Sequence, residues 1–303
     1  MDQLTFFTAS RILIVAGKGG VGKTTVSAGL AMAAAQIGLS VLFVELDEKP
    51  SSERFFACPT PLGYDSTEIA VIDPQSGTGQ LRARRITAQA ALSDYLDTHG
   101  LGRVSRRLMK SGIADIIATA APGIDDLLVL GKIKALDIEN VADLIVVDGP
   151  AAGHAISMLM APRALHQTVS GGPIHQQAEE ILGLLGDGSR CQVMLVTIAE
   201  TTPINELVET AYALEEEVGV QLAPLVINCV EEQGLLNIHE SLNPQSGLVQ
   251  AGQFHNSRVT SQLHEIIRLS QSIPLPTLTL PILSEIHCDV ISAALLNQIR
   301  LLP

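Results

Sequence analysis

The chain has few cysteines, few basic residues and no repeated or low-complexity segment. Its four cysteines lie far apart, without a C-x-x-C pair, which is typical of reduced thiols and disfavours both a disulfide framework and a zinc clasp. Only 19 Lys and Arg stand against 32 Asp and Glu, a net charge of −13, so we expect no nucleic-acid partner. No proline-rich linker divides the 303 residues. We therefore expect a single domain over 1–303.

Charged residues are also missing between Thr24 and Val44, a stretch as long as a membrane helix. Gly29, Gln36 and Gly38 interrupt it, and its two halves fit a buried helix followed by a buried strand. The N-terminus opens with an acid and soon reaches a lysine-containing loop, unlike a secretory signal. We expect a cytoplasmic protein with no intrinsic membrane span.

A phosphate-binding loop follows the first apolar run. Residues 12–25 read I-L-I-V-A-G-K-G-G-V-G-K-T-T, a strand leading into G-x-x-x-x-G-K-T and then an alanine-rich helix. Glycines let the backbone N–H groups turn inward and leave room for a phosphate at the positive end of the helix. The glycines concerned are Gly17, Gly19, Gly20 and Gly22.

The other loop residues have assignable roles toward ATP and Mg²⁺. Lys23 is placed to reach the β- and γ-phosphate oxygens, and the Thr24 hydroxyl is placed to bind Mg²⁺. Val21 and Thr25 complete the predicted nucleotide-binding segment. The sequence predicts an ATP-binding protein.

A second lysine, Lys18, occupies a position that the general loop pattern leaves free. The stretch K-G-G-V-G-K-T resembles the deviant loop of the P-loop ATPases that include MinD, ParA, the nitrogenase iron protein and ArsA. That resemblance implies a dimer in which Lys18 crosses the interface and touches the partner's nucleotide. The alternative is a solvated surface lysine.

The remaining pattern predicts an α/β fold, with a mostly parallel sheet covered by helices on both faces. Apolar runs predict central strands at 12–16, 41–46, 144–147, 193–198 and 222–229, and crossover helices at 26–37, 173–186 and 203–218. The long span before 144 predicts a mainly helical insertion at about 75–137, with helical spacing over 86–97 and 103–118. A second helical excursion is expected at about 230–272.

Acidic residues end two of the predicted strands. Asp148 closes the run D-L-I-V-V-D-G-P-A-A-G-H at 143–154, where its carboxylate can hold a magnesium water while the Gly153 N–H senses the γ-phosphate. Asp47 follows the second strand and is a candidate for orienting the attacking water. Glu45 points to the same face of that strand as Asp47, so spacing alone does not decide which of the two orients the water.

Together these segments resemble the ArsA-type ATPases, which include the arsenite-pump ATPase and the ATPase that delivers tail-anchored membrane proteins. The likeness also covers A-P-G-I-D-D at 121–126, V-I-N-C-V at 226–230 and L-P-I-L-S-E at 280–285. It is strongest to the short actinobacterial members. It implies that Asp47 positions water in the first switch, that Asp148, Gly153 and His154 form the second switch, and that the adenine is bound by Asn228, Pro281 and Ile282.

The chain departs from that family in two places. Ala152 replaces the usual threonine of the second switch, which removes a hydroxyl near the phosphate and predicts slower hydrolysis. Asp47 is followed by E-K-P-S rather than P-A-H-S, which weakens the assignment of Asp47 to water positioning. The cysteines do not form the close set that an arsenite site requires. Cys191 and Cys229 fall at apolar strand positions and are expected in the core.

The resemblance implies a dimeric ATPase switch, formed with itself or with a paralogue, that handles a membrane-related client. Two alternatives remain open. One is a non-hydrolysing nucleotide-binding subunit, which Ala152 favours. The other is a ParA- or MinD-like positioning ATPase, which the negative charge and the nearly uncharged C-terminal segment disfavour.

Overall fold

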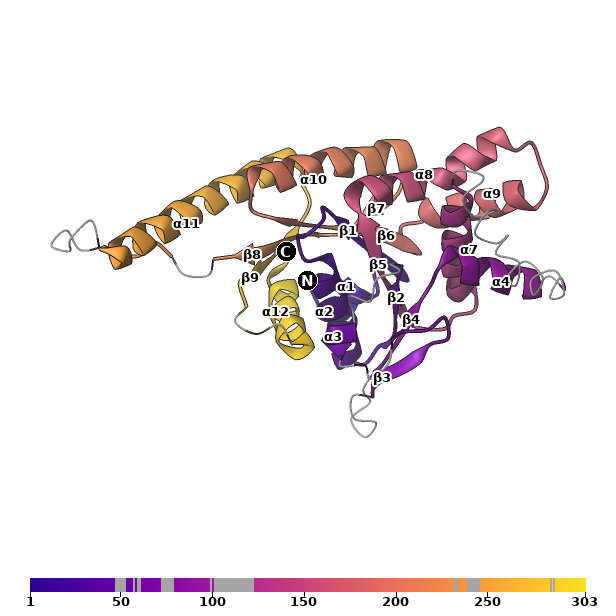
Figure 1. Cartoon of the computed structure of the whole chain (residues 1–303), viewed down its shortest axis with the longest axis horizontal. Helices are drawn as coiled ribbons and strands as arrows, with labels where there is room; N and C mark the ends of the chain where they lie inside the picture. Colours follow the sequence, from indigo (N-terminus) through magenta and orange to yellow (C-terminus); the bar gives the residue numbers. More distant parts are fainter. Residues whose placement is uncertain are drawn as a thin grey trace.

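The computed structural model describes residues 1–46, 53–56, 58, 61–71, 79–98, 100, 123–231, 234–238, 246–283, 285 and 287–303. One sheet crosses the molecule in the order β3-β4-β2-β5-β1-β6-β8-β9, with short β7 also paired to β6. All pairs are parallel except β3 with β4. Helices cover both faces (Figure 1), which confirms the predicted fold class.

The central strands match the apolar runs of the sequence. Their bounds are β1 Ile12–Gly17, β2 Ser40–Glu45, β5 Leu144–Ala151, β6 Cys191–Ile198, β7 Gln221–Leu222, β8 Leu225–Val230 and β9 Thr277–Pro281. The run at 222–229 was expected to be one strand and is divided at Pro224. Proline has no N–H to donate to a neighbouring strand, so the chain steps from β7 to β8 there.

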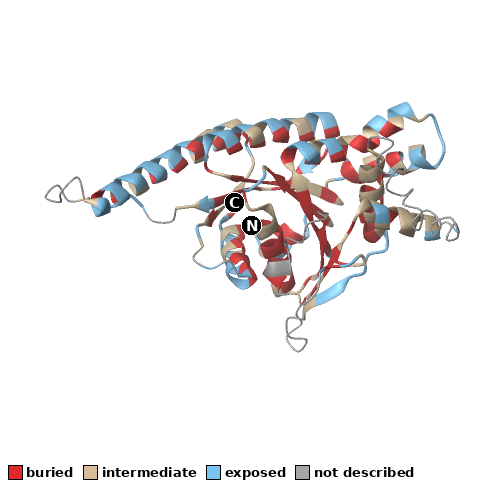
Figure 2. Ribbon diagram, viewed as in Figure 1, coloured by how far each residue is buried: buried red, intermediate tan, exposed pale blue. Residues whose placement is uncertain are grey.

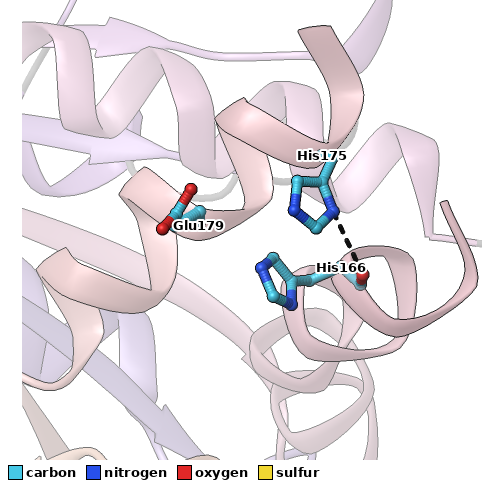
Figure 3. Close-up of side chains that lie close together, drawn as sticks. All are labelled: His166, His175 and Glu179. Carbon is cyan, nitrogen blue, oxygen red and sulfur yellow. Dashed lines mark hydrogen bonds between the residues drawn. The ribbon is translucent and has the colours of Figure 1, made fainter. Parts of the chain in front are cut away.

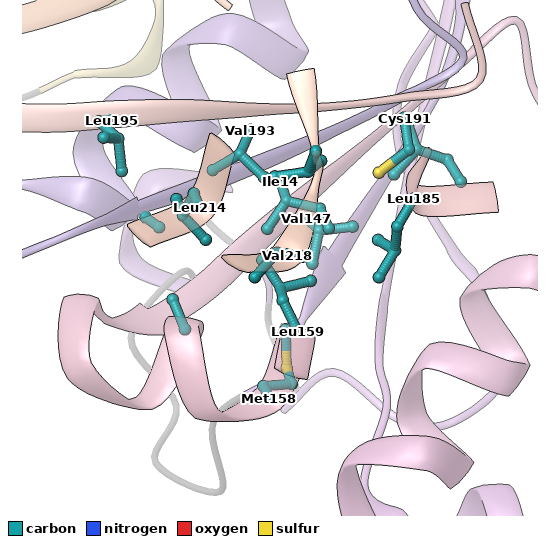
Figure 4. Packing of buried hydrophobic residues seen from close by; sticks show 14 of the residues in the cluster. Ile14, Val147, Met158, Leu159, Leu185, Cys191, Val193, Leu195, Leu214 and Val218 are labelled. Atoms are coloured by element: carbon teal, nitrogen blue, oxygen red, sulfur yellow. The ribbon is translucent and has the colours of Figure 1, made fainter. Parts of the chain in front are cut away.

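Strand alternation divides the core into two halves. Ile12 and Ile14 of β1 face one buried cluster, while Leu13 and Val15 face the other. Figure 2 shows the central strands buried along their length, as expected for a parallel sheet covered on both sides. Figure 4 shows the first cluster, where Ile14 and Val147 lie beside Leu159.

The helices form two layers. The phosphate-loop face carries α1 Gln3–Phe7, α2 Lys23–Gln36, α3 Glu53–Phe56 and α12 Cys288–Leu301. The opposite face carries α7 Ile124–Ile138, α8 Ala152–Thr168, α9 Pro173–Leu185, α10 Thr201–Ala213 and α11 Gly247–Ser272. A π-helical segment, Leu214–Val218, extends α10. The predicted helices 26–37 and 173–186 therefore form, and 203–218 forms as α10 with its π-helical extension.

The insertion predicted at about 75–137 is less helical than expected. Its described part contains α4 Ala88–Thr98 and most of α7, but also the strand β4 Gln80–Arg85, which pairs with β2 and with β3 Thr67–Val71. Leu81 and Ala83 are buried and alternate with arginines. The arginine side chains bind groups that are distant in the sequence. The helix predicted at 103–118 lies outside the described residues.

Three of those distant partners are visible. Arg82 donates to the Val141 carbonyl, the Arg84 guanidinium lies 4.5 Å from the centre of the Tyr64 ring, and Arg85 pairs with Glu45. Burial lowers the pKa of Arg84, while Tyr64 opposes that shift. These arginines thus belong to a strand of the sheet.

Among the described residues of the second predicted excursion, at about 230–272, those of α11 are helical, whereas Val230 belongs to β8. Ser246 caps α11 by accepting from the Val249 N–H at 3.3 Å, and the Gly247 end extends past the sheet (Figure 1). Among the described residues, no helix is long and apolar enough to cross a membrane.

One predicted core residue lies outside the core. Cys191 is buried as expected, but Cys229 is exposed. Its φ of 56° places it in the left-handed region, where the pairing of β8 with β9 shifts register. That turn points the thiol outward.

Candidate functional site

The phosphate loop joins the carboxyl end of β1 to α2, at the centre of the sheet. Gly17 has a φ of 154°, and a Cβ there would lie 2.2 Å from the Val196 carbonyl oxygen. Gly20 and Gly22 have φ values of 86° and 93°, which side chains rarely adopt. Three of the four loop glycines are therefore required by backbone geometry, whereas a Cβ at Gly19 would meet open space.

The two loop lysines have different surroundings. Lys23 Nζ donates to the Lys18 carbonyl at 3.2 Å, so its ammonium lies under the loop. Lys18 Nζ instead lies 2.5 Å from Oε1 of Glu206 on α10. Both side chains of that pair are partly exposed, at 36% and 41%.

Asp148 lies next to the start of α2. The Thr24 hydroxyl donates to its Oδ2 at 2.7 Å and the Ser27 hydroxyl to its Oδ1 at 3.0 Å. Burial raises the pKa of Asp148 to about 6, against the opposing effects of Thr24, Ser27 and Lys23. Ser27 was not predicted as a site residue, although its position three residues after Thr24 places both on one helix face.

Glu45 and Asp148 occupy neighbouring positions on adjacent strands, in register between β2 and β5. Glu45 is fully buried, and its Oε2 accepts from Arg85 Nε at 2.9 Å and Nη2 at 2.7 Å. The Glu45 carboxylate is thus bound in a structural ion pair. Asp47, the other candidate for positioning water, lies outside the described residues.

Asn228 contacts the phosphate loop directly. It is buried, and its Nδ2 donates to the Val21 carbonyl at 2.9 Å. A Cβ on Gly22 would lie 2.3 Å from that Nδ2, so the glycine and the asparagine fit together. The amide predicted to bind adenine thus also supports the loop from the end of β8.

The other predicted base-binding residues lie beside Asn228. Pro281 pairs with Val230 across β8 and β9, and the Ile282 N–H donates to the Val230 carbonyl at 3.0 Å. The Ile282 side chain is 46% exposed. An apolar side chain held at this edge is suited to stack on a nucleobase.

The predicted second switch begins α8. Gly153 and His154 are exposed, Ala152 is buried, and the capping residue Ala151 offers no side-chain acceptor. The first N–H groups of α8 are therefore open to an anionic ligand. Burial raises the pKa of Asp126 on α7, Asp125 raises it further, and His154 lowers it.

Three features define a P-loop nucleotide-binding protein. They are a glycine-rich loop with its lysine turned inward, a helix that begins at that loop, and a strand-ending aspartate that accepts a hydrogen bond from the loop threonine. Residues 10–171 match the model of the family described as "Anion-transporting ATPase". The chain belongs to this family, that of the ArsA-type ATPases. It is an ATP-hydrolysing enzyme.

Relatives support this assignment over most of the chain. ATPase BagA of Mycobacterium tuberculosis is 31% identical over 308 residues, covering 91% of this chain and 88% of that protein. ATPase GET3 of Chaetomium globosum is 29% identical over 268 residues, covering 84% and 73%. ATPase ARSA1 of Chlamydomonas reinhardtii is 28% identical over 186 residues, covering 55% and 24%.

Proposed function

We propose that the chain is a dimeric switch that couples Mg-ATP hydrolysis to the handling of a membrane-related client. The observation that carries this proposal is Lys18, a loop lysine whose ammonium points to Glu206 on α10 rather than toward the phosphate cradle. A lysine placed there can serve a nucleotide bound on a second chain. The second chain is a copy of this one or a paralogue.

Within one chain, the roles follow from position. The loop N–H groups and Lys23 bind the phosphates, and the 17–25 segment orients the triphosphate. The Thr24 hydroxyl and the Asp148 carboxylate offer the oxygen ligands that Mg²⁺ prefers, and their 2.7 Å contact suits a metal held by one directly and by the other through water. Bound Mg²⁺ would neutralise charge on the transferring phosphate.

Water activation is assigned to Asp47, since Arg85 already binds the Glu45 carboxylate. Gly153 is assigned the role of sensing the γ-phosphate through its N–H at the start of α8. Ala152 supplies no hydroxyl there, which favours slow turnover. If turnover proves absent, the non-hydrolysing subunit becomes the better description.

A client surface is supported by the exposed apolar side chains of α11. Leu248 and Phe254 are 78% and 69% exposed near its outer end, and Leu263 and Ile267 are 53% and 57% exposed one helical turn apart. Contiguous exposed apolar patches mark interaction sites, and these side chains are the candidates for one on α11. An apolar segment of a membrane protein fits their chemistry.

The test is steady-state ATPase activity across protein concentrations, for wild type, Lys18→Ala and Lys23→Ala, with nucleotide binding measured alongside. We expect specific activity to rise with concentration, Lys18→Ala to abolish turnover while ATP still binds, and Lys23→Ala to lose binding. Concentration-independent turnover that survives Lys18→Ala would refute the dimer. ATP-dependent co-sedimentation with protein-free vesicles would instead favour a positioning ATPase.

A further inference from the structure

Three potential metal ligands meet where α8 turns into α9, far along the chain from the phosphate loop. His166 lies in the last turn of α8, and His175 and Glu179 lie four residues apart on α9. One ligand atom from each lies within 4.8 Å of the others. Figure 3 shows the two rings near each other, with the Glu179 side chain close by.

The hydrogen bonds of His175 determine which nitrogen is free. Its Nδ1 lies 2.7 Å from the Val169 carbonyl and 3.2 Å from the His166 carbonyl. A carbonyl only accepts, so Nδ1 carries the hydrogen and Nε2 presents its lone pair. Metal-binding histidines are usually oriented by this kind of contact from the second nitrogen to a carbonyl.

The charged residues near the cluster do not occupy its metal-binding atoms. Among the described residues, Glu179 has no hydrogen bond or ion pair, whereas its neighbour Glu180 binds Lys134. Arg163, one turn before His166, donates to the carbonyls of Glu217 and Val218. No described cation therefore competes for the Glu179 carboxylate.

We propose that His166, His175 and Glu179 bind a divalent transition-metal ion of the Zn²⁺ type, leaving at least one position for water. Two imidazoles and a carboxylate suit Zn²⁺ better than Mg²⁺ or Ca²⁺. Tetrahedral Zn²⁺ with bonds of about 2.0–2.1 Å separates its ligand atoms by roughly 3.3 Å. The rings now stack with centroids 4.1 Å apart, and small side-chain rotations would complete the site.

Occupancy would clamp the corner between the two helices. The linking turn contains Gly171 and Gly172, the latter with a φ of 87°, and His175 bonds back across it to the His166 and Val169 carbonyls. A bound ion would add a cross-link between the end of α8 and the first turns of α9. The site is separate from the predicted Mg²⁺ ligands Thr24 and Asp148, and the proposal does not depend on dimerisation.

The test is direct Zn²⁺ titration of the untagged, chelator-treated chain by calorimetry, with Co²⁺ absorption spectra as a second readout. His175→Asn places an amide N–H where Nδ1 was, so it keeps the turn contact while removing Nε2. Glu179→Gln removes the exposed carboxylate. His264→Ala, at an exposed histidine on α11, is the matched control.

We expect one equivalent of Zn²⁺, binding weakened about tenfold or more in His175→Asn and in Glu179→Gln, and no change in His264→Ala. The Co²⁺ spectrum should lack a thiolate charge-transfer band. Wild-type affinity in both ligand variants, no stoichiometric binding by wild type, or a thiolate band lost in Cys229→Ser would each overturn the proposal.

Discussion

Lys18 and Glu206, 188 residues apart in the sequence, form a 2.5 Å ion pair between the phosphate loop and α10. The lysine that the proposed dimer requires in trans is thus held in cis. As two chains close around nucleotide, Lys18 would leave Glu206 and bind the nucleotide of the partner chain. This requires ATP to bind the closed state more tightly than the open one.

Replacing Glu206 should therefore release Lys18. An exposed pair of this kind is worth about 1 kcal/mol or less, so Glu206→Gln should raise ATPase activity at low protein concentration by roughly two- to fivefold. The measurement is specific activity against concentration. Glu209→Gln, at an exposed position of the same helix, should behave as wild type, and reduced activity in Glu206→Gln would contradict an inhibitory role for the pair.

Substitution of Glu45 should affect stability, whereas substitution of Asp47 should affect catalysis. Glu45→Gln removes the buried carboxylate that binds Arg85, whose side chain is only 14% exposed, and should cost about 3 kcal/mol in the free energy of unfolding. Asp47→Asn should leave stability unchanged and lower kcat. Urea unfolding and steady-state kinetics on both variants check this; the assignment fails if Asp47→Asn keeps full turnover.

Asp148→Asn should lower turnover by at least about 100-fold without destabilising the nucleotide-free chain. Its carboxylate is buried and costly to keep charged, and the amide retains a partner for the Thr24 or Ser27 hydroxyl. The measurement is the melting temperature with and without Mg-ATP, together with kcat. Asp143→Asn, at an exposed position before the same strand, is the control; a large loss of apo stability would contradict this explanation.

Asn228→Ala should weaken the binding of both ATP and GTP, with the larger loss for ATP. Loss of the bond to the Val21 carbonyl affects the loop with either nucleotide, at about tenfold. The Oδ1 atom can accept from the amino group of adenine but would face the carbonyl of guanine. Competition binding with both nucleotides tests this, and equal losses would limit Asn228 to supporting the loop.

Cysteine labelling should follow burial. Burial raises the pKa of Cys191 and of Cys288 to about 12, so almost no thiolate exists at pH 8. Cys229 is exposed, although partial burial raises its pKa as well. Mass spectrometry after iodoacetamide treatment should find Cys229 modified, with Cys191 and Cys288 unmodified until denaturant is added; native labelling of Cys191 would refute the β6 packing.

Local sequence was sufficient to predict the loop and the strands around it, because β1, the glycines and α2 are contiguous. Asp148 was predictable for the same reason, since an apolar run ends at it. Contacts between distant segments were not: Glu206 gives no local sign that it meets Lys18, and β4 fell within the insertion predicted to be mainly helical. Cys229 was misplaced because a single left-handed residue reverses the facing that alternation predicts.

Pro162 lies inside α8. Proline cannot donate to the carbonyl four residues earlier, and the next residue, Arg163, is tied to the carbonyls of Glu217 and Val218. The end of the helix is thus fixed to the body, and the portion from Ala152, about 15 Å long, packs against the core through Ala155 and Leu159. A tilt of about 10° at Pro162 would swing Gly153 through roughly 2–3 Å, the scale on which an N–H gains or loses a phosphate oxygen.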